Sequence, residues 1–196
     1  MILDFDMILG LFSWKSKEIE KKELSIMPIK IGMDVKYESD YNYVLIDMKL
    51  RKKMGLSRGD EIMIIGKKKY FARLIPYYQI NTPKNTILIN DVIKCNLENN
   101  YGDKVIITPI WKYEVHGANF KILKLKIIQL NERIVDRGFL NDWFEDKIVM
   151  KNMRYDFSYF GRQIQFIVEQ IITSTGHDEE FGWVRSSTQI ENRLNN

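Results

Sequence analysis

The stretch Gly59-Asp60-Glu61-Ile62-Met63-Ile64-Ile65-Gly66-Lys67 has the pattern of a β-strand enclosed by two tight turns. Gly59 can adopt the positive φ angle that a tight turn requires. Ile62 and Ile64 fall on one face of an extended chain, because side chains alternate across a strand. Gly66 and the lysines after it then turn the chain into another apolar run. The stretch therefore predicts a turn, a strand and a second turn.

This pattern is repeated 43 residues further along the chain, at Gly102-Asp103-Lys104-Val105-Ile106-Ile107. The strand residues upstream match as well, because Val44 to Asp47 align with Ile87 to Asn90 without a gap. Each copy therefore contains a strand, a mixed segment, a Gly-Asp turn and a second strand. The mixed segments, Met48 to Leu56 and Asp91 to Leu97, are predicted to form short helices. The repeat predicts two interlocked halves of a closed β-barrel, whose closure removes exposed strand edges.

The composition favours a mainly β fold. The 196 residues are enough for one large domain or two small ones. Hydrophobic residues make up 45% of the chain and charged residues 29%, which is typical of a folded soluble domain. Alanine occurs only at Ala72 and Ala118, and this scarcity disfavours a helix bundle. We therefore expect a mainly β protein with short helices.

Charge and cysteine content limit the partners and the compartment. The net charge of +4 is spread along the chain. It fits weakly acidic partners and is too small and too dispersed to predict binding to nucleic acid. Cys95 is the one cysteine, so the chain cannot form an internal disulfide. This cysteine usage fits a reducing cytoplasm.

Residues 1–14 are apolar, but Asp4 and Asp6 interrupt them. The run is too short and too acidic for a membrane span. Two interpretations are open: an amphipathic helix that docks on a partner or a membrane surface, or an element that packs on its own domain. Residues 15–25 are rich in Lys and Glu and are predicted to be a solvated helix or linker.

The remaining chain divides into a barrel and a second β subdomain. Pro28 to Val35 is predicted to be the first strand of the barrel. After Trp111, residues 119–128 and 163–172 have the alternation of strands, and residues 131–144 between them have helical spacing. In the first of these strands, Leu123, Leu125 and Ile127 are predicted to share one face. The predicted organisation is an N-terminal extension at 1–28, a barrel at 29–110, a second subdomain at 111–192 and a frayed tail at 193–196.

The chain shows no recognisable catalytic constellation, so we predict that it is not an enzyme. It contains no Gly-x-x-x-x-Gly-Lys-Ser/Thr nucleotide-binding loop. His116 and His177 are too few and too far apart to predict a metal site with Cys95, and no cofactor is expected. Cys95 itself is predicted to be buried and unreactive.

Asp60 and Asp103 occupy equivalent positions in the two copies and could be read as a catalytic pair of carboxylates. The Asp-Thr-Gly or Asp-Ser-Gly sequence of aspartic proteases is missing at both positions. We predict instead that each side chain caps its turn by accepting a hydrogen bond from a nearby backbone N–H group.

The two copies resemble the N-terminal domain of the valosin-containing protein and VAT class of AAA ATPases. The resemblance rests on Leu56 to Lys68 with Ala72-Arg73-Leu74, on Ile87 to Ile107, and on Phe160 to Val168 with the late strand around Trp183. It implies a double-psi β-barrel followed by a four-stranded β-clam. The ATPase modules of that class are absent from this sequence. The resemblance therefore implies a free-standing version, similar to the ubiquitin-fusion-degradation adaptor, or a piece of a larger protein.

The resemblance also implies a binding site. In that family the domain docks adaptors and substrates in a hydrophobic groove between barrel and clam. Aromatic side chains suit this role, because they supply a large contact area and dominate binding hot spots. The other interpretation places the same aromatic residues in the barrel core. Carried over position by position, the groove residues would be Tyr43, Ile75, Tyr77 and Tyr113, with Trp143 and Phe144 from the clam.

We therefore predict a cytoplasmic, non-catalytic protein-binding domain for adaptor or substrate recognition in an AAA unfoldase system of protein quality control. The implied partners are an AAA ATPase module, its adaptors or unfolding substrates. Two alternatives come from other classes. One is a barrel enzyme that acts on a small molecule in the same cleft, and the other is a weak nucleic-acid binder that uses the lysine-rich faces.

Overall fold

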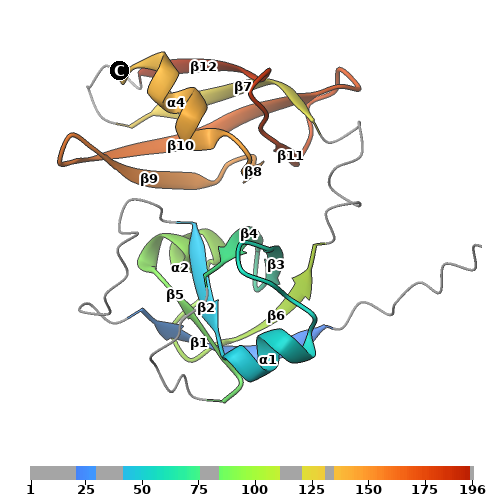
Figure 1. Ribbon diagram of the computed structural model, residues 1–196. Helices are drawn as coiled ribbons and strands as arrows, with labels where there is room; N and C mark the ends of the chain where they lie inside the picture. Colours follow the sequence, from blue (N-terminus) through green and yellow to red (C-terminus); the bar gives the residue numbers. More distant parts are fainter. Residues whose placement is uncertain (1–20, 30–41, 76–83, 111–120, 131–134, 195–196) are drawn as a thin grey trace, which may run out of the picture.

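The computed structural model describes residues 21–29, 42–75, 84–110, 121–130 and 135–194. These residues form a six-stranded barrel and a second β subdomain, the clam, which lie one above the other in Figure 1. The apolar residues 1–14 lie outside the described residues. The mainly β fold with short helices, predicted from the repeat and the composition, is confirmed.

The barrel is closed, with the strand order β1-β5-β2-β4-β3-β6 and pairing between the last strand and the first. Closure leaves no strand edge of the barrel unpaired. Two short helices connect the strands at the positions that the sequence predicts. The elements are β1 (Lys22–Pro28), β2 (Tyr43–Ile46), α1 (Met48–Lys53), β3 (Glu61–Ile65), β4 (Lys69–Leu74), β5 (Thr86–Ile89), α2 (Asp91–Leu97) and β6 (Lys104–Pro109).

The barrel consists of two equivalent halves related by a pseudo-twofold axis. Exchanging β1 with β4, β2 with β5 and β3 with β6 reproduces every strand pairing and its direction. The register agrees as well, because Leu45 pairs with Leu88 and Ile64 pairs with Ile107, the pairs that a shift of 43 residues maps onto themselves. The predicted interlocked halves are therefore confirmed.

The two Gly-Asp turns share the same capping hydrogen bond. Asp60 Oδ2 accepts a hydrogen bond from the Ser57 N–H at 2.7 Å, and Asp103 Oδ2 accepts one from the Asn100 N–H at 2.8 Å. The glycines that precede them, Gly59 and Gly102, have φ angles of 81° and 95°, a region that residues with a Cβ atom rarely adopt. The prediction that both carboxylates cap turns is confirmed.

Strand β1 corrects the prediction for the N-terminal part of the barrel. Residues 22–28, predicted to belong to a solvated linker and an extension, form a barrel strand that pairs with β5 and β6. The Lys and Glu residues concealed the alternation of Leu24 and Ile26, which are both fully buried. The first strand therefore ends at Pro28, where the sequence predicts it to begin.

Cys95 also differs from the prediction, because its side chain is exposed. It lies on α2, and the buried side of this helix is formed by Ile93, Asn96 and Leu97. Matching Cys95 to its repeat partner Lys52 would have placed it correctly, because Lys52 is exposed as well.

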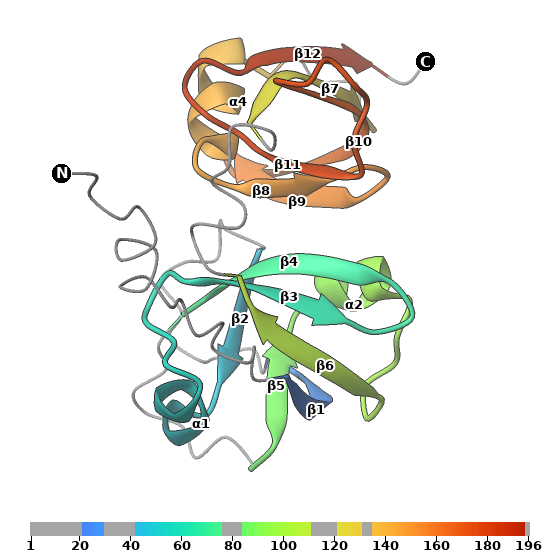
Figure 2. The ribbon, with the colours of Figure 1, turned by 90° about the vertical axis from the view of Figure 1, so that its right-hand side faces the viewer.

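The clam is built on a four-stranded sheet with the order β12-β7-β10-β9, together with a two-stranded sheet of β11 and β8. In Figure 2 these strands and α4 surround a common interior. That interior is filled by fully buried aromatic and aliphatic side chains, including Phe144, Phe157 and Phe166. The elements are β7 (Ile122–Gln129), α4 (Arg137–Phe144), β8 (Ile148–Met150), β9 (Arg154–Tyr159), β10 (Arg162–Thr173), β11 (Phe181–Trp183) and β12 (Gln189–Leu194).

Two predictions for the clam are wrong in detail. Leu123 is 50% exposed, whereas Leu125 and Ile127 are buried. The register between β7 and β10 shifts next to Leu123, and such a bulge turns the extra residue away from its neighbours' face. Arg193 and Leu194, predicted to belong to a frayed tail, lie in β12 and pair in parallel with β7.

Candidate functional site

Barrel and clam are joined by aromatic stacking and by hydrogen bonds. Tyr70 of β4 stacks on Tyr155 of β9 with 6.4 Å between ring centroids, and Phe71 packs on Phe181 at 5.0 Å. Burial raises the pKa of both tyrosine hydroxyls, so both stay protonated at neutral pH. These contacts fix how the two subdomains face each other.

The side chain of Asn96 makes the most directional link between the subdomains. Its Nδ2 donates to the Arg154 carbonyl at 2.8 Å, and its Oδ1 accepts from the Arg154 N–H at 3.1 Å. Both polar groups of one amide side chain are thus satisfied by one backbone residue of the clam. Helix α2 is thereby attached to the start of β9.

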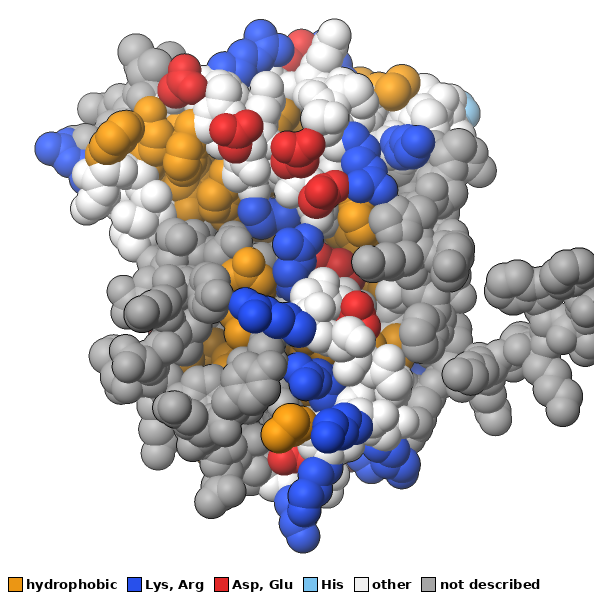
Figure 3. Space-filling view, in the orientation of Figure 1, with side chains coloured by type: hydrophobic (Ala, Val, Ile, Leu, Met, Phe, Trp, Pro, Cys, Tyr) orange, Lys and Arg blue, Asp and Glu red, His pale blue; other side chains and the backbone are white. Residues whose placement is uncertain are grey.

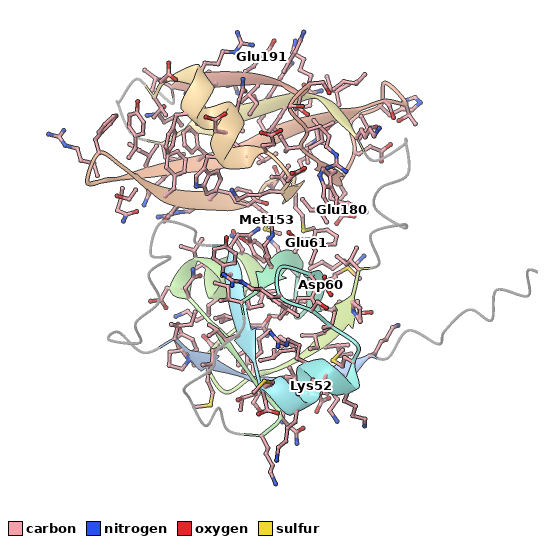
Figure 4. The ribbon with its side chains drawn as sticks, viewed as in Figure 1. Lys52, Asp60, Glu61, Met153, Glu180 and Glu191 are labelled. Atoms are coloured by element: carbon pink, nitrogen blue, oxygen red, sulfur yellow. The ribbon has the colours of Figure 1, made fainter. Side chains whose placement is uncertain are left out.

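A cleft of about 290 Å³ lies at the boundary between barrel and clam. Figure 4 shows Asp60 and Glu61 at the edge of the barrel that faces the clam, with Met153 and Glu180 on the clam side opposite. Clefts between domains are common positions for ligand sites. The cleft is lined by Gly59, Asp60, Glu61, Arg73 and Ile110 of the barrel and by Asp146, Trp183 and Arg185 of the clam.

Two arginines organise the charges of this cleft. Arg73 Nε lies 2.9 Å from Glu61 Oε1, and Arg73 Nη2 donates to the Asp146 carbonyl at 2.6 Å. Arg185 Nη1 lies 2.6 Å from Asp146 Oδ1, and its guanidinium group lies 4.3 Å from the ring centroid of Trp183. Arg73 therefore links the barrel to the clam, while Arg185 presents a charge stacked on an aromatic surface.

The lining offers groups that can hold a ligand. It offers guanidinium donors, the exposed carboxylate of Asp146, and apolar contact from Ile110 and Trp183. Among the residues that the structure describes, no group of three or more His, Cys, Asp or Glu side chains could hold a metal ion. His116 lies outside the described ranges.

The residues predicted for the groove are distributed differently. Tyr43 and Ile75 are half-buried at the edges of β2 and β4, and Tyr43 lies opposite Arg73 in the strand register. Trp143 is half-buried against Phe157 in the clam, with 4.7 Å between the ring centroids. None of these three lines the cleft. Tyr77 and Tyr113 lie outside the described residues.

Phe144 requires a correction. Its side chain is 0% exposed and packs among Tyr155, Phe166 and Trp143 inside the clam. A partner could reach it only by opening the clam core, so it cannot line a groove in this structure. It belongs to the core, the interpretation that competed with the groove.

The cleft residues that the sequence analysis did not select could have been found from one signal. Glu61 and Arg73 are charged residues in mainly apolar strands, and the two lie directly opposite each other in the β3–β4 register. Charged residues are rarely buried in a strand unless they are paired. Trp183 and Arg185 gave no such signal, because their position follows from the folding of the clam onto the barrel.

A larger hollow of about 960 Å³ lies on the clam alone, between α4, β10 and β12. Its charged lining is partly paired within the clam, for example through the contact of Arg193 with Glu169. We place the candidate site in the smaller cleft because both subdomains contribute to it. Within the described part of the chain, no helix is long and apolar enough to cross a membrane.

Comparison with protein families agrees with the resemblance seen in the sequence. The family model described as cell division protein 48 (CDC48), N-terminal domain, matches residues 33–111. This range includes both copies of the repeat and ends one residue after Ile110 of the cleft. Over these residues, the chain is similar to the CDC48 N-terminal domain, the class that the resemblance in the sequence predicted.

Proposed function

We propose that this chain is a non-catalytic protein-binding domain that recognises adaptors or substrates for an AAA ATPase of the CDC48 type, and that it does so in the cytoplasm. The observation that carries the proposal is the family match over the barrel. The barrel forms a cleft together with the second subdomain. Two arrangements are compatible with this role: a separate chain that works beside the ATPase, and one domain of a longer protein.

The cleft suggests how a partner would be held. Trp183 and Ile110 supply apolar contact for an anchor side chain, while Arg185 supplies a charged donor whose stacking on Trp183 limits its freedom. A carboxylate of the partner would compete with Asp146 for Arg185. An apolar anchor flanked by an acidic residue therefore fits this lining best.

The test is a pull-down from the source cell with the immobilised chain, in which the CDC48-type ATPase and its adaptors are quantified by mass spectrometry. Arg185→Ala should reduce their recovery by about tenfold, as expected for a charged contact of about 1.4 kcal/mol. Tyr77→Ala tests the groove position implied by the resemblance. Arg162→Ala is the matched control, because Arg162 is an exposed clam arginine outside the cleft.

Two results would contradict the proposal. One is that neither the ATPase nor its adaptors are recovered with the wild-type chain. The other is that Arg162→Ala reduces recovery as strongly as Arg185→Ala, since attraction would then depend on net charge and not on the cleft. Circular dichroism and melting temperature establish that each variant is folded.

A further inference from the structure

Helix α1 carries a continuous basic face on the barrel. Met48, Lys49, Lys52 and Lys53 are exposed, whereas Leu50 and Arg51 are half-buried. At about 100° per residue, the four exposed positions fall within an arc of about 140° on one side of the helix. We call this surface the basic face of α1. Figure 4 shows Lys52 at the end of the barrel that points away from the clam.

The pseudo-twofold axis provides an internal comparison for this face. In α2 the positions of Lys49, Lys52 and Lys53 are taken by Val92, Cys95 and Asn96. Asn96 makes the hydrogen bonds that hold the clam. One position of the basic face, Lys53, is therefore equivalent to the residue that holds the clam in the second half, while the equivalent of Lys52, Cys95, is exposed.

Helix stability does not explain the charges on this face. Cations favour the last turn of a helix, which accounts for Lys52 and Lys53. Lys49, however, lies in the first turn, where a cation opposes the helix dipole and where α1 has no acidic residue. Its spacing of three from Lys52 and four from Lys53 also brings like charges together.

Two of these charges, those of Lys49 and Lys52, have no ion-pair partner among the described residues. By contrast, Lys94 of α2 lies 2.9 Å from Asp91. The described barrel residues include fourteen basic and seven acidic side chains, and the described clam residues include ten of each. Figure 3 shows basic side chains in a band that runs down over the barrel.

We propose that the basic face of α1 docks an acidic segment of a protein partner, at a site separate from the cleft. The proposal rests on the proposed function, because that function makes the partner a protein. Six helical residues span about 9 Å, which suits two or three carboxylates and not the six to ten phosphate contacts typical of a DNA-binding surface. Met48, which is 40% exposed, adds apolar contact beside the cations.

The test uses a fluorescein-labelled deca-glutamate peptide and the purified full chain, with binding followed by fluorescence anisotropy at about 0.15 M salt, where the Debye length is about 8 Å. The double variant Lys49→Glu, Lys52→Glu should weaken binding by at least about fivefold, since exposed charge pairs contribute up to about 1 kcal/mol each. The matched control is Lys67→Glu, Lys69→Glu. It makes the same change in net charge on the exposed β3–β4 turn of the same barrel, and it should weaken binding less than about twofold.

Equal weakening by both double variants would overturn the proposal, because attraction would then follow net charge alone. It would also be overturned if the chain bound vesicles containing phosphatidylserine, or single-stranded DNA, more tightly than the peptide at the same salt concentration. The assay contains no ATPase, so it can fail while Arg185→Ala still loses the ATPase in the pull-down. Failure of the docking face and failure of the proposed function are therefore distinguishable.

Discussion

The two halves of the barrel share one backbone plan and differ in what they present on their surfaces. Both have a capped helix, a Gly-Asp turn, and strands paired in equivalent registers. The first half presents lysines on α1, and the second half presents the amide of Asn96 to the clam. The plan thus depends on a few turn, cap and core residues that the halves share, while the two helices differ in the side chains they present.

The largest effect should come from the pair of residues on the pseudo-twofold axis. Ile64 and Ile107 face each other between β3 and β6, and both are fully buried. We expect Ile64→Ala and Ile107→Ala each to lower the free energy of unfolding by about 3 kcal/mol, because each leaves a cavity in the core. Urea denaturation measures both losses. If they differ by more than about 1.5 kcal/mol, the two halves are not energetically equivalent.

An intermediate effect should distinguish the two helices. Asn96→Ala removes both hydrogen bonds to the Arg154 backbone, and we expect it to lower the free energy of unfolding by about 2 kcal/mol. Lys53→Ala, at the equivalent position of α1, should change it by less than about 0.5 kcal/mol, since Lys53 is exposed. Thermal unfolding followed by circular dichroism tests both. Equal losses of unfolding free energy would show that the hydrogen bonds from α2 to the clam stabilise the protein no more than the exposed side chain of Lys53 does.

The smallest effect on stability should come from the turn-capping carboxylate of Asp103, and it should depend on pH. The Asn100 N–H and then the Asn99 side chain lower the pKa of Asp103 below its ordinary value. A lowered pKa in the folded state stabilises the protein above the unfolded-state value of about 3.9, and this contribution is lost as the pH falls through the folded-state value. The deficit of Asp103→Asn relative to wild type should therefore be constant between pH 7 and pH 5.

As the pH falls below about 4 that deficit should shrink, and it should vanish only below the lowered folded-state pKa, where the wild-type carboxylate is protonated as well. Denaturation midpoints measured across this range check the result. Asp60→Asn at neutral pH is the companion variant, since Asp60 caps the equivalent turn but has Leu56 where the second half has Asn99. A deficit of Asp103→Asn that grew on acidification would contradict the assigned hydrogen bonds.

The repeat made most of the barrel predictable from sequence. A gapless shift of 43 residues fixes β2, α1 and β3 against β5, α2 and β6. Strand β1 escaped this comparison, because its equivalent is β4 and the register relates the two by 48 residues instead of 43. The alternation of Leu24 and Ile26 was the only local signal, and charged neighbours obscured it.

The candidate site was less predictable, because it is formed by residues that are distant in sequence. Arg73 meets Asp146 only after the clam has folded onto the barrel. No sequence-spacing rule relates two residues that belong to different subdomains and lie far apart in the chain. The resemblance pointed to Phe144, whose aromatic side chain suits a groove, yet a bulky aromatic residue can serve a core as well as a surface. Burial, which a sequence does not display, separated these roles.

The position of β1 has a consequence for how this domain is delimited. Residues 22–28 lie between β5 and β6, although the family match begins only at residue 33. A fragment that starts at residue 33 would lack β1, one of the six strands of the barrel. Strands β5 and β6 would then expose rows of unpaired backbone donors and acceptors to other chains. The folding unit is therefore longer than the segment that the family model matches, and the additional residues lie on its amino-terminal side.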